Sequence, residues 1–114
     1  MNPSYYLQMS EIGKPIIDKL RIDEYLQSDC ISTIYALESA GMGWDFNLSS
    51  ALKYLWRLGQ KTEDYSDDLR KAITYLQWEY GSNKSVNQVR LIVSALDLAG
   101  LVLYAHESQK HNSN

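Results

Sequence analysis

Residues 47–61 read NLSSALKYLWRLGQK, and this stretch decides the fold of the chain. Its apolar side chains recur every three or four residues, which is the spacing of one face of an α-helix. They are Leu48, Ala51, Leu52, Leu55 and Leu58. Asn47 is a good N-cap residue, and Gly59 suits the left-handed turn that often ends a helix. The stretch therefore predicts an amphipathic helix that buries one face.

Similar patterns on both sides of this stretch predict further helices. Upstream, Pro15 suits the first turn of a short helix that ends near Ser28, and another helix follows from residue 29 to Gly41. Downstream, a polar turn leads into a helix that begins near Ser66. Its inner stripe consists of Leu69, Ala72, Ile73 and Leu76. A long last helix is expected over residues 85–107.

The composition fits one all-α domain. Of the 114 residues, 45% are hydrophobic and 22% are charged, so the chain can bury a core and is not expected to be disordered. We predict a compact bundle of about four main helices plus a short N-terminal helix over residues 1–107. A flexible polar tail is expected at 108–114.

Charge, cysteine content and hydropathy exclude several classes of protein. The net charge of -3 argues against bulk binding of nucleic acid. Cys30 is the single cysteine, so an internal disulfide and a cysteine-based zinc site are excluded. No apolar run approaches the roughly 20 residues of a membrane span, and no signal peptide is recognisable. We therefore expect a cytoplasmic protein without a membrane partner.

A basic cluster stands out in this acidic chain. Five of its eleven basic residues lie between positions 53 and 71, namely Lys53, Arg57, Lys61, Arg70 and Lys71. An antiparallel helical hairpin would bring the two halves of the cluster together. Like charges spaced four residues apart on a helix repel, and a bound anion would relieve that repulsion. Because Arg and Lys are the usual ligands of phosphate oxygens, the cluster predicts a nucleotide-phosphate site.

The aromatic residues suggest how the rest of a nucleotide would be held. The chain has nine Tyr and three Trp but only one Phe, and Tyr and Trp suit interfaces and base-stacking pockets. The candidates for a base or interface contact are Tyr5, Tyr6, Tyr54 and Trp56. Two alternatives stay open: the rings could line an ordinary core, and neighbouring carboxylates could neutralise the cations as surface ion pairs. Those carboxylates are Glu63, Asp64, Asp67 and Asp68.

Residues 47–61, together with DDLRKAITYL at 67–76, resemble a family of small phage-encoded helical proteins. Its signature reads lGnAiKYlwRaGkK…eDLkKAiwYL, and some of its members are labelled nucleotide kinases. Weaker matches occur at residues 2–6 and 28–31. Tyr5 stands where the family has histidine, and Ser49-Ser50 stand where it has Gly-Asn. The resemblance implies a nucleotide-binding protein, and the change at Tyr5 implies binding without catalysis if that histidine has a chemical role.

Two functional hypotheses follow. The first is a phage-type nucleotide-binding protein which, if it is an enzyme, is a nucleoside monophosphate kinase that uses Mg²⁺. No GxxxxGK[ST] motif occurs, so a P-loop kinase is excluded, and no metal site made by the chain alone is predicted. The alternative is a non-enzymatic counter-defence protein in the host cytoplasm. It would sequester a signalling nucleotide or another phosphorylated small molecule, or bind and inhibit a host immune protein.

The last helix carries a separate expectation. It is apolar on more than one face, which predicts a central position or a subunit interface and therefore a homo-oligomer. Asp97 lies in the middle of its apolar run, where an unpaired buried carboxylate would be costly. We expect Asp97 to pair with Arg90 or with a lysine of another helix, or to hold Mg²⁺.

Overall fold

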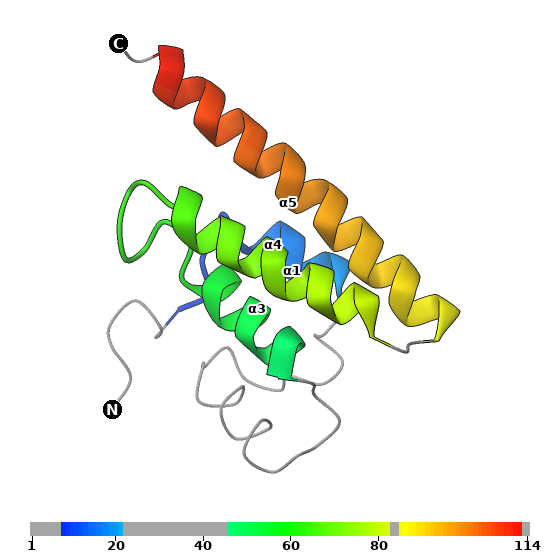
Figure 1. Ribbon diagram of the computed structural model, residues 1–114. Helices are drawn as coiled ribbons and strands as arrows, with labels where there is room; N and C mark the ends of the chain where they lie inside the picture. The colour runs from blue at the N-terminus through cyan, green and yellow to red at the C-terminus, as the bar shows by residue number, and fades with distance from the viewer. Residues whose placement is uncertain (1–7, 22–45, 83–84, 113–114) are drawn as a thin grey trace.

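Four helices make up the part of the chain that the computed structural model describes, residues 8–21, 46–82 and 85–112 (Figure 1). They are α1 (Lys14–Lys19), α3 (Phe46–Trp56), α4 (Ser66–Gly81) and α5 (Val86–Asn112). These ranges contain no strand, so the predicted all-α bundle is confirmed. The helix predicted from residue 29 to Gly41 lies outside the described residues, as do Tyr5 and Tyr6.

The helices α3 and α4 form a hairpin, and α5 runs back along α4 and extends beyond it (Figure 1). α4 packs on both α3 and α5, while α1 packs on α5 and α3. A single core lies between them. Its fully buried members include Ile16, Ile17, Leu52, Leu55, Leu69, Leu76 and Ala99. α4 therefore connects α3 and α5 on one side of the core, and α1 connects them on the other.

The apolar stripe of residues 47–61 is buried as its pattern predicts, but α3 begins at Phe46, so Asn47 lies inside the helix and is not its N-cap. Four of the five stripe residues, from Ala51 to Leu58, are fully buried, and Leu48 is half-buried. α3 ends at Trp56, and the turn that follows contains Gly59, whose φ of 74° lies in the left-handed region that favours glycine. The inner stripe of α4 is confirmed as well, since Leu69, Ala72 and Leu76 are fully buried and Ile73 is half-buried.

The segment before α1 is tied to the end of α3. The backbone N–H of Ser10 donates to the Trp56 carbonyl at 2.8 Å, and its hydroxyl donates to the Leu58 carbonyl. The same hydroxyl accepts hydrogen bonds from the N–H groups of Ile12 and Gly13, each at 3.1 Å. Ser10 is 1% exposed, so these bonds satisfy a buried hydroxyl.

α1 is shorter than predicted. Pro15 lies in its first turn as expected, but the helix ends at Lys19 and not near Ser28. The N–H of Leu20 donates to the Ile17 carbonyl, and Arg21 then takes a positive φ of 55°, which turns the chain out of the helix. The pattern of apolar residues alone does not show this early end.

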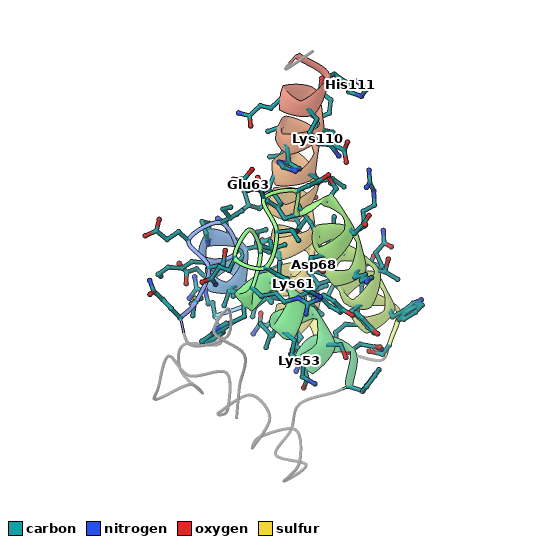
Figure 2. All side chains as sticks on the ribbon, turned by 90° about the vertical axis from the view of Figure 1, so that its left-hand side faces the viewer. Lys53, Lys61, Glu63, Asp68, Lys110 and His111 are labelled. Carbon is teal, nitrogen blue, oxygen red and sulfur yellow. The ribbon has the colours of Figure 1, made fainter. Side chains whose placement is uncertain are left out.

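α5 is longer than predicted, because it continues past Glu107 to Asn112. Ion pairs hold its last turns against the loop before α4 and against α4 itself. Lys110 Nζ lies 2.9 Å from an Asp64 carboxylate oxygen, and Glu107 accepts a hydrogen bond of 2.7 Å from Arg70. His106 lies 3.1 Å from Asp64. Figure 2 shows Lys110 and Glu63 at this same end of the molecule.

Among the described helices, α5 alone has the length and composition of a membrane span, over Val86–His111. Only 17% of its most apolar stretch is buried within the protein. Arg90 and Asp97 interrupt this stretch, which is why it does not stand out in the sequence as an uninterrupted apolar run. Asp97 is exposed on the outer side of α5, and it forms no ion pair with Arg90 or with a lysine of the described residues, so the expected pairing is not found.

The close approach of Gly13 to α3 generates a first prediction. A Cβ atom at Gly13 would lie 1.8 Å from the Leu55 carbonyl oxygen, so Gly13→Ala must displace backbone. We expect the variant to lose about 1–3 kcal/mol of unfolding free energy, or more, in urea titrations followed by circular dichroism. Gly81→Ala is the matched control, because no atom lies within 4 Å of its Cβ position. Equal stability of both variants would contradict the close approach.

The Asp64 contacts generate a second prediction, on pH. The Lys110 ammonium, together with the Ser66 N–H and with His106, lowers the pKa of Asp64 below its ordinary value of 3.8. A carboxyl whose folded-state pKa is lowered stabilises the protein above its unfolded pKa, and this contribution is lost as the pH falls towards the folded value. The unfolding free energy of the parent should therefore decline more steeply below about pH 4 than that of Asp64→Asn. Glu63→Gln, which alters a neighbouring exposed carboxyl, should behave like the parent.

Candidate functional site

A shallow depression of about 280 Å³ lies on the outer side of the hairpin, and we call it the α3–α4 groove. Tyr54 lines it from α3. The lining residues from α4 are Arg70, Lys71, Thr74, Tyr75 and Trp78. Both cations and rings therefore border the same depression.

The spacing of α4 explains this lining. Lys71, Tyr75 and Trp78 follow one another at intervals of four and three residues, so they lie on one face of the helix. Leu69, Ala72 and Leu76 point into the core from the other side. The amphipathic pattern of α4 thus directs one face into the core and places the groove residues on an outer face.

The rings of the groove pack on one another. Tyr54 and Tyr75 are stacked, with ring centroids 5.9 Å apart and an interplanar angle of 14°. Phe46 and Trp78 each meet Tyr75 edge-on, at 6.0 Å and 5.4 Å. Phe46 is 66% exposed and Trp78 is 58% exposed. Large apolar rings that stay this exposed offer a surface to which a planar ligand can bind.

Two cations lie over the Tyr54 ring. The Arg57 Cζ atom lies 4.9 Å from its centroid, and the Lys71 Nζ atom lies 5.5 Å from it. Both distances are within the range of a cation–π interaction. Lys71 is exposed, and no carboxylate among the described residues pairs with it. The groove therefore contains an ammonium group that can accept an anion without first losing an ion pair to those residues.

The five predicted cations are not gathered in one place. Arg57 forms two hydrogen bonds to Asp68, of 3.0 Å and 3.1 Å, and both side chains are mostly buried, with exposures of 12% and 14%. Arg70 lines the groove but is paired with Glu107. A largely buried guanidinium needs a matching carboxylate, which is the physical reason that Arg57 is occupied within the fold.

Lys53 and Lys61 do not line the groove. Lys61 follows α3 in the loop, and Figure 2 shows it well above Lys53 in the view. Of the predicted phosphate ligands, the structure thus places Arg70 and Lys71 in the groove, while Arg57 contacts it only through the Tyr54 ring.

The structure also changes the set of aromatic residues that can contact a base. Trp56 is fully buried in the core, so it cannot present a face to a ligand and is withdrawn from the candidate site. Tyr54 lies in the groove, whereas Tyr5 and Tyr6 fall outside the described residues. The groove residues absent from the prediction are Thr74, Tyr75 and Trp78. Their spacing from Lys71 on one helix face was the signal that could have identified them.

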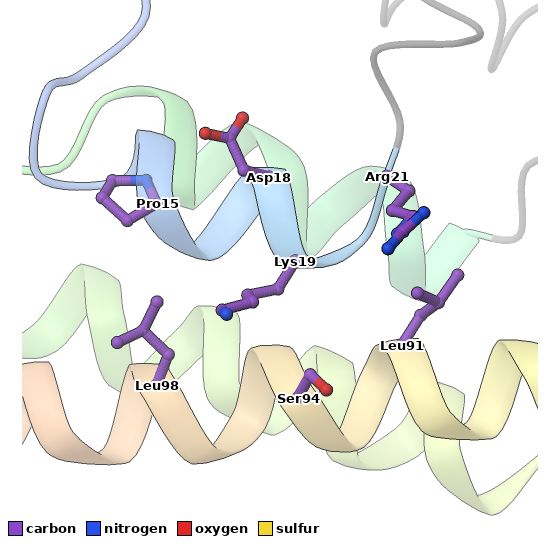
Figure 3. Close-up of a pocket in the computed structure, with 7 residues that line it drawn as sticks. All are labelled: Pro15, Asp18, Lys19, Arg21, Leu91, Ser94 and Leu98. Atoms are coloured by element: carbon purple, nitrogen blue, oxygen red, sulfur yellow. The ribbon is translucent and has the colours of Figure 1, made fainter.

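A second depression, of about 640 Å³, lies between α1 and α5 (Figure 3). Lys19 points toward α5, and Arg21 lies above Leu91 in the view. Ser94 and Leu98 complete the α5 side. The described residues that line this depression include two cations but no aromatic ring, so it suits a nucleotide base less well than the α3–α4 groove.

Within the described ranges, no group of three or more His, Cys, Asp or Glu side chains is arranged to hold a metal ion. The carboxylates described above are engaged mainly by cations of the chain, as at Asp68 and Asp64. Any Mg²⁺ in this site would thus depend on the phosphates of the ligand for coordination.

Comparisons with protein-family models, with curated proteins and with solved structures find no match for this chain. The resemblance to the phage-encoded family thus rests on the motif residues alone and stays a prediction.

The Arg57–Asp68 pair generates a third prediction. Asp68→Asn replaces two charge-assisted hydrogen bonds in a mostly buried place, so the unfolding free energy should fall by about 1–3 kcal/mol. The neighbouring Asp67 is exposed and has no ion pair with another described residue, so Asp67→Asn should change stability by no more than about 0.5 kcal/mol. Urea titrations of the two variants measure both values. A loss as large in Asp67→Asn as in Asp68→Asn would contradict a specific role for the pair.

Proposed function

We propose that the chain binds a phosphorylated nucleotide in the α3–α4 groove. One observation carries the proposal: Lys71, which has no carboxylate partner among the described residues, lies in the same depression as the stacked Tyr54 and Tyr75 rings and the exposed Trp78 ring. A nucleotide joins an anion to a planar ring, and each half has a matching surface here. Lys71 and the adjacent Arg70 would contact phosphate, and Tyr54, Tyr75 and Trp78 would contact the base.

The size of the groove limits the affinity. Its volume of about 280 Å³ is at the lower end of the range for small-molecule sites, so a nucleotide would stay partly exposed. Stacking of one base contributes about 1–3 kcal/mol, and a hydrogen bond to a charged group about 1.5–3 kcal/mol. Together these correspond to dissociation constants no tighter than about tens of micromolar. Binding assays therefore need high micromolar to millimolar nucleotide.

The lining of the groove favours binding over phosphoryl transfer. The described residues that line it include no carboxylate of the kind that accepts the proton of the substrate hydroxyl in protein kinases, and no imidazole. This observation favours the non-enzymatic reading, a protein that sequesters a nucleotide such as a signalling molecule. A nucleoside monophosphate kinase would instead consume ATP in the presence of Mg²⁺, whereas a sequestering protein releases its ligand unchanged on denaturation.

A fourth prediction separates the contributions of the Lys71 charge and of the Trp78 ring to nucleotide affinity. Lys71→Ala should weaken binding of a nucleoside monophosphate by about 10–100-fold while leaving the weak binding of the matching nucleoside unchanged. Trp78→Ala should weaken binding of both ligands, because it removes an apolar face. Isothermal titration calorimetry across purine and pyrimidine pairs, with and without Mg²⁺, measures these affinities. Circular dichroism verifies that each variant is folded.

Lys14→Ala is the charge-matched control for that experiment. Lys14 forms an exposed ion pair with Asp18 on α1, away from the groove lining, and the variant should bind as the parent does. If Lys14→Ala and Lys71→Ala lose affinity equally, the attraction comes from net charge and not from the groove. If no nucleotide binds the parent at millimolar concentration, the proposed function is wrong.

A further inference from the structure

The outer side of α5 carries a regular stripe of exposed residues. It consists of Val86, Arg90, Val93, Asp97, Leu101 and Tyr104. Their intervals of three and four residues place them on one helix face, which we call the α5 outer stripe. The opposite face, with Ile92, Ala95 and Ala99, is buried against the other helices. The stripe therefore points away from the described bundle.

Most of the stripe is apolar and uncovered by described residues. Val86 is 68% exposed, Leu101 is 67% exposed and Tyr104 is 74% exposed. Val93 is also exposed, and Gly100 beside the stripe has no atom within 4 Å of its Cβ position. Four exposed apolar residues on one face, on a helix with only 17% of its most apolar stretch buried, mark a contact surface.

The two charges of the stripe indicate what covers it. Arg90 and Asp97 are exposed, and neither has an ion pair within the described part of the chain. They are seven positions apart on the helix, which is roughly 10.5 Å along the axis and too far for a direct contact with each other. The stripe thus presents one positive and one negative group at a fixed separation, each without a described partner.

We infer that the α5 outer stripe pairs with the same stripe of a second copy of the chain, in antiparallel orientation. A two-fold axis that passes between Val93 and Ser94 places Arg90 opposite Asp97 of the partner subunit, and the symmetric pair forms on the other side of the axis. The same axis places Val86 opposite Leu101 of the partner subunit. Both pairs share this midpoint in the sequence, which is the self-complementarity that an isologous interface requires.

The charges also decide against the other arrangements of α5. In a parallel pair, Arg90 would face Arg90 of the partner subunit, and the carboxylates would likewise oppose each other. In a lipid bilayer, both charges would lie unpaired on the outer face of the helix, which is costly. Of these arrangements, antiparallel pairing alone matches both charges and also places Val86 opposite Leu101 of the partner subunit. The stripe shares no residue with the α3–α4 groove, so this inference does not depend on the proposed function.

A fifth prediction, based on charge reversal, tests this arrangement. Arg90→Asp or Asp97→Arg places like charges opposite each other twice, and either should weaken the dimer roughly tenfold or more. The double variant Arg90→Asp/Asp97→Arg restores both pairs with reversed polarity and should dimerise nearly as the parent does. Sedimentation equilibrium and native mass spectrometry measure the dissociation constants. Asp67→Arg on α4, the same change of charge outside the stripe, should leave the dimer intact.

Cross-linking tests the orientation in the full-length chain. Val86→Cys and Leu101→Cys are made separately with Cys30, the only native cysteine, replaced by serine. Mixing the two variants with a short thiol-to-thiol cross-linker should give mainly the 86-to-101 heterodimer. Predominant 86-to-86 and 101-to-101 products would overturn the antiparallel arrangement. If the parent chain is monomeric at high micromolar concentration, the proposed dimer is wrong. In that case, flotation with phosphatidylcholine–phosphatidylglycerol vesicles would indicate that the stripe binds lipid instead.

Discussion

The ion pair between Arg57 and Asp68 is the contact on which the arrangement of the described helices depends. It connects the residue just after α3 to the first turn of α4 through two hydrogen bonds, so it defines direction as well as distance. With the hairpin closed in this way, the leucine stripes of the two helices meet in the core. On the outer side, the Arg57 guanidinium lies over the Tyr54 ring, which places that ring beside α4. The same pair thus shapes both the core and the groove.

α4 links the two other features of the molecule. One of its faces is core, and the next forms the groove with Lys71 and Tyr75. From the same helix, Arg70 reaches Glu107 near the end of α5, close to the contact between Lys110 and Asp64. These ion pairs are mostly exposed and individually weak, but several at one place keep the end of α5 against the bundle. The nucleotide proposal and the interface on α5 therefore share a scaffold while using different faces.

The acidic residues determine which cationic side chains are available to bind an anion. Asp68 forms an ion pair with Arg57, and Glu107 forms one with Arg70. Lys71 is therefore the groove cation without a described carboxylate partner. Asp68 is close to the basic cluster in the sequence, and its use as an ion-pair partner was one of the two readings open from sequence. Glu107 lies 37 residues from Arg70, and no local pattern relates them. The predicted five-residue site therefore reduces to a smaller one because of long-range contacts.

The presence of the four described helices and the inner faces of α3 and α4 followed from the sequence alone, because periodicity and Pro15 act locally on the backbone. Local pattern did not show that Trp56 is buried while Trp78 is exposed, since that depends on which neighbours pack against each ring. Nor did it show that α1 ends at Lys19 or that α5 continues to Asn112. Only the tertiary structure decided these points, because burial, ion pairing and helix ends were settled by contacts between segments distant in the chain.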